Sequence, residues 1–317
     1  MSEPKRHHYV PAFCLAEFAE PRKRRGQLRW YDVNTGESGD GTPDNQAFER
    51  FFYTVETEDP KDALVLEHEF GKLESKCAPL IRAMNDSGTL PNDDDLALIL
   101  GLVAFQAVRV PAVLDKIERF QSDLLMKILK TSAAAAPEDF RAQALKINPE
   151  WTDEDIAEIK ETLDAFLGTK NPSIKFDQTS LLKVAIQGAG PIGDELIKRG
   201  WSLGIAPQGC SLITSDNPVV FQHMPGSGPL AAWSPGFGRS DTIVVWPTGP
   251  KHALFGYPRL AAPREHNLPA DSVAQINTII ARHADARVYF GGTGFRHLAP
   301  PEFDNVVDGP TDALIRK

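Results

Sequence analysis

Apolar residues recur with two different periods along the chain, and the helical period dominates its middle. From Asp62 to Ala83 they recur at three- and four-residue intervals, which predicts a helix with one apolar face. Pro91 and Asn92 begin a second helix. Its body from Leu96 to Val110 is apolar nearly all round, so we expect it to be buried. Further helices are predicted at Asp115 to Lys130, Glu138 to Leu145 and Thr152 to Phe166, with a linker at Ala133 to Pro137.

Short strands are predicted towards both ends. After a short helix at Pro11 to Phe18, Gln27 to Val33 alternates like a strand, and a turn at Asn34 to Gly36 leads into another. Phe48 to Val55 is an aromatic-rich strand candidate. A late amphipathic helix, Asp271 to His283, precedes a final strand. The strands predicted after Gly200 are Trp201 to Ala206, Ser211 to Thr214, Val219 to Gln222, Thr242 to Trp246, His252 to Tyr257 and Arg287 to Phe290.

Strands at both ends and helices between them indicate an α+β fold. We expect the N-terminal and C-terminal strands to form a mainly antiparallel sheet, with a helix-rich central region. The length of 317 residues is compatible with a single domain. Its three regions are residues 1–60 with short strands and a helix, 61–200 with helices, and 201–317 with the C-terminal sheet and helix.

The composition is that of a globular protein with an acidic balance. The 34 Lys and Arg against 43 Asp and Glu give a net charge of −9, so any polyanion site must be a local basic patch. No segment has the roughly 18 consecutive apolar residues of a membrane span, and the N-terminus lacks a signal-peptide core. We therefore expect a cytoplasmic protein with no membrane partner. The three cysteines have no C-x-x-C spacing and indicate no disulfide framework or thiolate zinc site.

Two polar motifs could carry chemistry in the first half of the chain. His7 and His8 stand in an extended segment before Pro11, so their side chains point to opposite faces and one can act as acid, base or ligand while the other packs. Gln106 and Arg109 share one face of the buried second helix. A buried guanidinium needs a counter-charge, so Arg109 faces either an internal carboxylate or an anionic ligand.

A third motif interrupts the C-terminal strands. Asp216 and Asn217 stand in Thr-Ser-Asp-Asn-Pro, where their side chains can bond the local backbone as an Asx-type turn. Alternatively, Asp216 is the partner of Arg109, a metal ligand or a general base. Both interpretations predict a well-fixed carboxylate.

Other patterns favour ordinary structure over chemistry. Gly188 to Gly193 matches G-x-G-x-x-G, but no succession of βαβ units follows it. The basic run Arg22 to Arg25 is either a solvated turn or a set of phosphate contacts. Glu67 to Glu69 with Glu74 offers metal ligands on a helix, of which only Glu67 and Glu74 clearly share a face. For Cys14, a role as a small buried side chain is favoured over a role as the nucleophile of a Cys–His pair.

The motifs together resemble a known family. His-His-Tyr-Val-Pro at residues 7–11, Phe-Glu at 48–49 through Phe-Tyr-Thr at 52–54, Gln-x-x-Arg-x-Pro at 106–111 and Thr-Ser-Asp-Asn-Pro-Val at 214–219 resemble the bacterial domain of unknown function 4238. The resemblance spans Pro4 to Tyr289. It implies that Gly188 to Gly193 is helical, and that Cys14 departs from the usual aromatic residue. It also implies one shared site, with no mechanism attached, built from His7, His8, Gln106, Arg109, Asp216 and Asn217.

The leading hypothesis is a hydrolase-like enzyme acting on a phosphoester or nucleic acid. In it, His7 or His8 is a general base or metal ligand, Asp216 orients it or binds metal, and Gln106, Arg109 and Asn217 hold the anionic substrate. A divalent metal is a candidate cofactor. The first alternative is a non-catalytic binding or regulatory module with a buried polar network. The second is a nucleotide-binding oxidoreductase using the Gly188 turn; the oligomeric state stays open.

Overall fold

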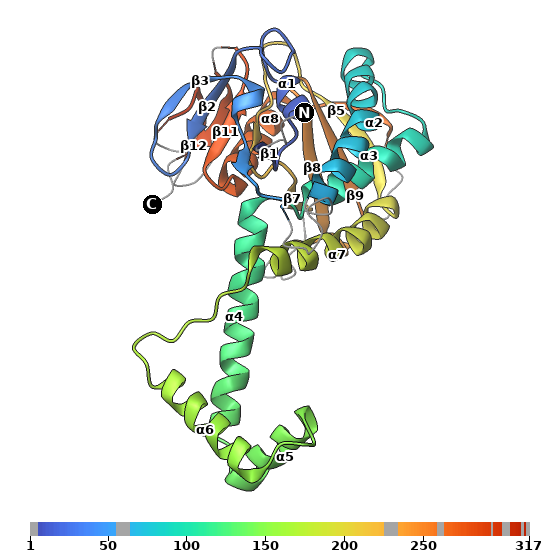
Figure 1. Cartoon of the computed structure of the whole chain (residues 1–317). Coiled ribbons are helices and arrows are strands. Elements are labelled where there is room, and N and C mark those ends of the chain that lie inside the picture. The colour runs from blue at the N-terminus through green and yellow to red at the C-terminus, as the bar shows by residue number, and fades with distance from the viewer. Residues whose placement is uncertain are drawn as a thin grey trace. The chain divides into compact units, whose positions relative to one another are not determined.

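A computed structural model describes residues 6–54, 64–224, 234–258, 263–292, 294–299, 305–311 and residue 314. The chain divides into two compact units: residues 1–113 with 182–317 form the larger and residues 114–181 the smaller. Helices and mainly antiparallel strands occur together, which confirms the predicted α+β class (Figure 1). The division into two units does not test whether the chain is one domain, so the single domain stays a prediction.

Two sheets organise the larger unit. One has the strand order β10-β5-β9-β8-β7, and only β10 and β5 are parallel in it. The other has the order β3-β2-β11-β6, so C-terminal β11 pairs directly with N-terminal β2, as predicted. The strands of the first sheet are β5 (Gly200–Ile205), β7 (Val220–His223), β8 (Thr242–Gly249), β9 (His252–Tyr257) and β10 (Glu265–Asn267). Those of the second are β2 (Leu28–Asp32), β3 (Ser38–Gly41), β6 (Thr214–Ser215) and β11 (Arg287–Phe290).

Alternating residues of β8 divide the core of this unit. Ile243 and Val245 join a cluster with α8 (Ala270–His283) and residues of both sheets. Val244 and Trp246 point the other way, into a second cluster with α2 (Val65–Ser87) and α3 (Asp93–Gln106). This is the period of two expected of a strand that is buried on both faces. The helix α3 is buried as predicted, and the Asn92 side chain caps it by accepting from the Asp95 N–H at 3.0 Å.

The N-terminal segment folds against this frame. The strand β1 (Arg6–His8) pairs antiparallel with β4 (Phe48–Arg50), and α1 (Ala12–Ala16) follows directly. The predicted strand from Phe48 ends early because Phe51 has a left-handed φ of 60°, which turns the chain. Its last predicted residue, Val55, and the predicted start of the first long helix at Asp62 lie outside the described residues.

Several elements were not predicted, and the strand at Arg287–Phe290 is not the last one, because β12 and β13 follow it. A 3-10 helix (Pro43–Asn45) precedes β4, and β12 (Arg296–Ala299) pairs with β13 (Asn305–Asp308). The helix α4 (Pro111–Ala133) leads into the smaller unit, where α5 (Pro137–Ile147) and α6 (Asp153–Leu167) pack around Phe140 and Ile156. Among the described residues no single helix is long and apolar enough to span a membrane, and α3 with α4 would qualify only as a bent pair.

One predicted alternative is wrong. The glycines from Gly188 to Gly193 lie inside α7 (Gln178–Ile197) and do not form a turn between a strand and a helix. Inside a helix the backbone N–H groups bond the preceding turn and cannot surround a pyrophosphate. The oxidoreductase interpretation of this motif is therefore abandoned, and the helical expectation is confirmed.

A buried polar network holds α1 against α2 and β8. Glu17, at the end of α1, has a side chain that is only 3% exposed and accepts hydrogen bonds from Arg82 at 2.8 Å and from Asn85 at 3.1 Å. The Asn85 amide also donates to the backbone carbonyl of Thr248 at 2.7 Å, and the Thr248 hydroxyl donates back to Asn85 Oδ1 at 2.8 Å. Every polar atom of the Asn85 side chain is thus used.

We expect Asn85→Ala to lower the free energy of unfolding by about 2–3 kcal/mol, because it leaves buried donors and acceptors on Glu17 and Thr248 unpaired. Urea denaturation measures the change. Lys76→Ala, at an exposed position of the same helix, is the control and should change stability by no more than about 0.5 kcal/mol. Equal stability of the two variants would contradict the role of this network.

Candidate functional site

A pocket in the larger unit lies between the N-terminal segment and α2. This central pocket has a volume of about 380 Å³, and residues of α1 and the α2 helix form most of its wall. Its ionisable lining residues are His8, Arg24, Glu67 and Glu74. A histidine, two carboxylates and an arginine therefore converge from segments up to 66 residues apart in the sequence.

The two adjacent histidines have different environments, as the extended backbone predicted. His7 is fully buried, accepts a hydrogen bond from the Tyr53 N–H at its Nδ1 atom (2.8 Å) and stacks on the Tyr53 ring. His8 lines the central pocket, and its Nε2 atom is buried without a hydrogen-bond partner among the described residues. His7 thus packs with both its ring and its Nδ1 atom engaged, whereas His8 keeps one buried ring nitrogen that is not engaged in a hydrogen bond within the described part of the chain.

Burial and then the positive charge of Arg24 lower the pKa of His8, while a backbone hydrogen bond to Asp44 works in the opposite direction. The ring is therefore neutral at neutral pH. Because that bond leaves Nε2 without a partner, the neutral ring carries its proton on Nδ1 and a lone pair on Nε2. Such a nitrogen can accept a proton.

The two carboxylates of the pocket lie on one face of α2, seven residues apart. Burial, and next the negative charge of Glu74, raise the pKa of Glu67 to about 7. Glu74 instead pairs with Arg109 at 2.9 Å. Glu67 is therefore partly protonated at neutral pH and can act as an acid, while Glu74 is held in an ion pair.

Arg109 lies behind this wall with a side chain that is 1% exposed. Besides Glu74, it donates to Gln106 Oε1 at 3.2 Å and lies 4.9 Å from the centre of the Phe70 ring. Its Nη1 atom is buried and finds no hydrogen-bond partner in the part of the chain that the structure describes. Of the two predicted partners for this guanidinium, an internal carboxylate or an anionic ligand, the structure supplies the carboxylate.

The Gln106 side chain bonds the backbone of the N-terminal segment. Its amide donates to the carbonyl oxygen of Tyr9 at 2.9 Å, and the Tyr53 hydroxyl donates to the carbonyl of Arg109 at 3.2 Å. These contacts fix the segment after His8 and the turn after β4 to the end of α3. The side chain of Gln106 therefore positions the pocket wall.

Asp216 and Asn217 lie at a different place in the larger unit. Both Asp216 oxygens accept backbone N–H groups at 2.7 Å, from Asp285, Ala286 and Arg287. The Asn217 amide donates to the carbonyl of His283 at 3.0 Å. Burial raises the pKa of Asp216 to about 6 although the three N–H donors lower it. This carboxylate is well fixed, as both interpretations expected, and its partners join α8 to β11.

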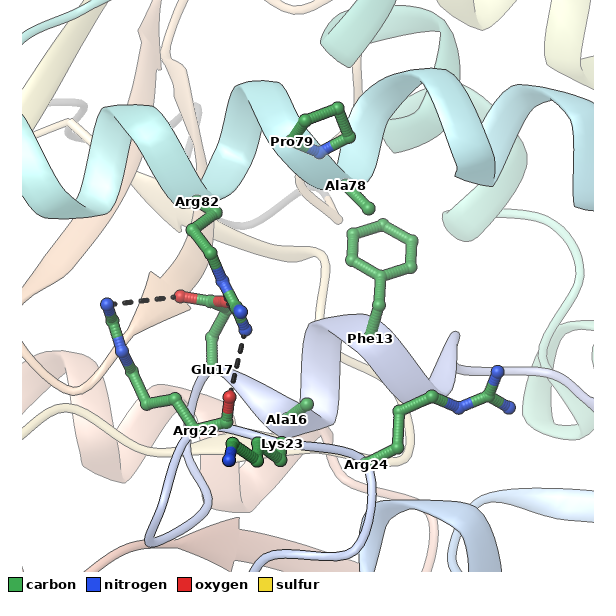
Figure 2. A pocket seen from close by; sticks show the side chains of 9 residues that line it. All are labelled: Phe13, Ala16, Glu17, Arg22, Lys23, Arg24, Ala78, Pro79 and Arg82. Atoms are coloured by element: carbon green, nitrogen blue, oxygen red, sulfur yellow. Dashed lines mark hydrogen bonds and ion pairs between the residues drawn. The ribbon is translucent and has the colours of Figure 1, made fainter.

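Two basic pockets adjoin the central one. The first, here called the basic pocket, has a volume of about 670 Å³ and is lined by His8, Asp44, Arg6, Lys23, Arg24 and Arg25. The second, the Glu17 pocket, has a volume of about 390 Å³. Figure 2 shows Glu17 between Arg22 and Arg82, with the Phe13 ring standing towards Ala78 and Pro79 of α2. Arg24 lines all three pockets.

The structure thus separates the six predicted site residues. His8 lines the central pocket, and Arg109 with Gln106 supports its wall, whereas His7 is packed behind it and Asp216 with Asn217 line none of the three pockets. Sequence reasoning noted Glu67 and Glu74 only as metal ligands, and Arg24 only as part of a basic run. Their helical spacing and the density of that run were the available signals.

Cys14 and the possible metal ligands were two further candidates in the sequence. Burial raises the pKa of Cys14 well above its usual range, which suppresses the nucleophilic thiolate. Within the described part of the chain, no group of three or more His, Cys, Asp or Glu side chains is placed to hold a metal ion.

Comparison with known proteins identifies a family and no activity. A family model described as a protein of unknown function, DUF4238, matches residues 6–293. No curated protein and no solved structure matches the chain.

We expect Asp216→Ala to lower the free energy of unfolding at pH 7 by about 3 kcal/mol, because three backbone N–H groups lose their acceptor. Asp216→Asn keeps one acceptor oxygen and should lose less. Urea denaturation of both variants measures the difference. An Asp216→Ala protein as stable as the original would show that this carboxylate does not maintain the junction of α8 and β11.

The raised pKa of Glu67 makes stability depend on pH. Since its folded-state pKa of about 7 exceeds the ordinary value of 4.5, the folded state retains the proton longer, and stability falls as pH rises from about 4.5 to 7. Glu67→Gln removes this cost. Allowing for the partial exposure of the side chain, we expect the melting temperature to rise by about 2–4 °C at pH 8 and to be unchanged near pH 4.5. A gain that is equal at both pH values would disprove the assignment.

Proposed function

Because the chain belongs to the DUF4238 family, whose description names no activity, we propose a function from the site itself: a hydrolase-like enzyme that cleaves a phosphate ester by general acid–base catalysis. The observation that carries the proposal is that His8 and Glu67 line one pocket with opposite protonation preferences. Pairs of groups whose environments separate their protonation states in this way are typical of acid–base catalysts.

The two groups divide the proton transfers of hydrolysis. In this scheme the neutral His8 ring takes a proton from a water molecule, whose oxygen attacks phosphorus. Glu67 gives its proton to the oxygen that leaves as the phosphorus–oxygen ester bond breaks. Afterwards His8 loses its proton to solvent and Glu67 regains one, so one water molecule is consumed for each alcohol and phosphate released.

Arg24 supplies the charge that a phosphate requires. It lines the central pocket beside His8, and the neighbouring Lys23 and Arg25 keep the adjoining surface positive. A guanidinium binds phosphate oxygens in a fixed fork geometry. The overall charge of −9 would otherwise repel such a substrate, so the local cations decide the preference.

A second candidate is a non-catalytic binding module. It is favoured by the fact that His7, Gln106, Asp216 and Asn217 all bond the backbone, as a structural network does. In that case the central pocket binds its ligand without turnover. Activity measurements on the pocket residues separate the two candidates.

We expect the purified protein to hydrolyse aryl phosphate mono- or diesters, and His8→Gln and Glu67→Gln each to lower kcat about 10²- to 10⁴-fold, the usual contribution of an acid or base. Activity should be greatest below pH 7, where His8 is neutral and Glu67 still holds its proton, and Glu67→Gln should remove the alkaline limb of the profile. Rates of product release at varied pH measure both effects.

The controls are His68→Gln and Glu69→Gln. They change the same residue types at exposed positions of α2, the helix that carries Glu67, and should leave the rate unchanged. Thermal melting confirms that each variant is folded. The hydrolase proposal would be overturned if the original protein were inactive on every ester tested. It would also be overturned if folded His8 and Glu67 variants kept full activity, and either result would favour the binding module.

A further inference from the structure

The central pocket has a positive neighbour on two of its borders. It shares His8 and Arg24 with the basic pocket, and Phe13, Arg24 and Ala78 with the Glu17 pocket. The central pocket itself has one cation against two carboxylates. Each neighbour instead has four cationic side chains against one carboxylate. Most of the cationic side chains therefore lie in the two neighbouring pockets and not in the central pocket.

The cations of the Glu17 pocket are held in place by the fold. The buried Glu17 carboxylate accepts hydrogen bonds from Arg82 at 2.8 Å and from Arg22 at 3.4 Å. The two arginine side chains nevertheless remain 46% and 42% exposed. Their direction is thus set before any ligand arrives, which reduces the entropy lost on binding. Figure 2 shows both guanidinium groups meeting at this one carboxylate.

Fewer cations of the basic pocket take part in ion pairs. Lys23 and Arg25 make no ion pair among the described residues, whereas Arg24 pairs with Asp44 at 2.7 Å. Lys23 lines both basic pockets. A free ammonium or guanidinium at the mouth of a pocket is suited to a phosphate whose exact position varies.

A single small phosphate ester would need only one of these basic pockets. Two of them, which both border the central pocket and share Lys23 and Arg24 with each other, fit a ligand that carries several phosphates. The partly buried Phe13 ring lines both the central and the Glu17 pocket, and aromatic rings are the side chains on which the bases of single strands stack. Flexible single strands can reach into pockets in this way, whereas a stiff duplex cannot.

We propose that the substrate is a single-stranded nucleic acid, bound with flanking phosphates in the basic and Glu17 pockets and one phosphodiester presented to His8 and Glu67. This rests on the proposed hydrolysis of a phosphate ester. The attacking water forms a bond to phosphorus, one ester bond breaks, and the products are a strand ending in a phosphate and a strand ending in a hydroxyl. Water is the only co-reactant.

The test is binding of labelled single-stranded DNA and RNA 12-mers, by fluorescence anisotropy at several salt concentrations, to the Glu67→Gln protein so that cleavage does not interfere. Lys23→Gln, Arg25→Gln and Arg82→Gln are added separately, with Lys146→Gln, an exposed residue of the smaller unit, as the control. Each pocket variant should weaken binding and reduce the slope of log affinity against log salt by about 0.7 for each phosphate that is no longer neutralised. The control should change neither.

A 12-mer that binds no more tightly than a mononucleotide, or a duplex that binds more tightly than either strand, would overturn the proposal. So would an unchanged salt slope in Lys23→Gln and Arg25→Gln proteins that thermal melting shows to be folded; neither substitution breaks an ion pair within the described part of the chain. Hydrolysis of small esters without tight strand binding would remove only this inference. Tight strand binding that the pocket variants weaken, with no hydrolysis by the original protein, would instead remove the proposed activity and leave the nucleic-acid ligand.

Discussion

The architecture of the site depends on how one buried charge, that of Arg109, is neutralised. A guanidinium with 1% exposure would destabilise the fold severely without partners, and it obtains them from Glu74, Gln106 and the face of Phe70. Each partner belongs to α2 or α3, so satisfying the charge joins the two helices. Gln106 also donates a hydrogen bond to the backbone carbonyl of Tyr9, and this bond fixes the strand that carries His8.

The same arrangement sets the protonation of the pocket. Glu74 pairs with Arg109, and its negative charge adds to the burial that raises the pKa of Glu67. On the opposite wall, Arg24 adds to the burial that lowers the pKa of His8. Structural ion pairs and the protonation states of the pocket residues are therefore coupled. A substitution that removes an ion pair also alters the pKa of a neighbouring pocket residue.

Much of the fold follows from local pattern. The periodic helices, the cap at Asn92 and the strand that ends at Phe290 are where the apolar spacing predicts them. The exceptions have local causes. The strand at Phe48 stops at a left-handed residue, and the predicted strand at Ser211 is reduced to Thr214–Ser215 because the preceding N–H groups bond the Asn277 side chain and the Pro250 carbonyl.

The sequence by itself determined the element types, the α+β class, the opposite facing of His7 and His8, and the need of Arg109 for a counter-charge. All of these depend on backbone period or on the cost of burying a group, which are properties of short segments. Only the tertiary structure decided that Glu74 is the partner of Arg109, that Asp216 joins α8 to β11, and that Arg24 stands beside His8. Contacts between distant segments depend on how whole elements pack, and packing is a property of the entire chain.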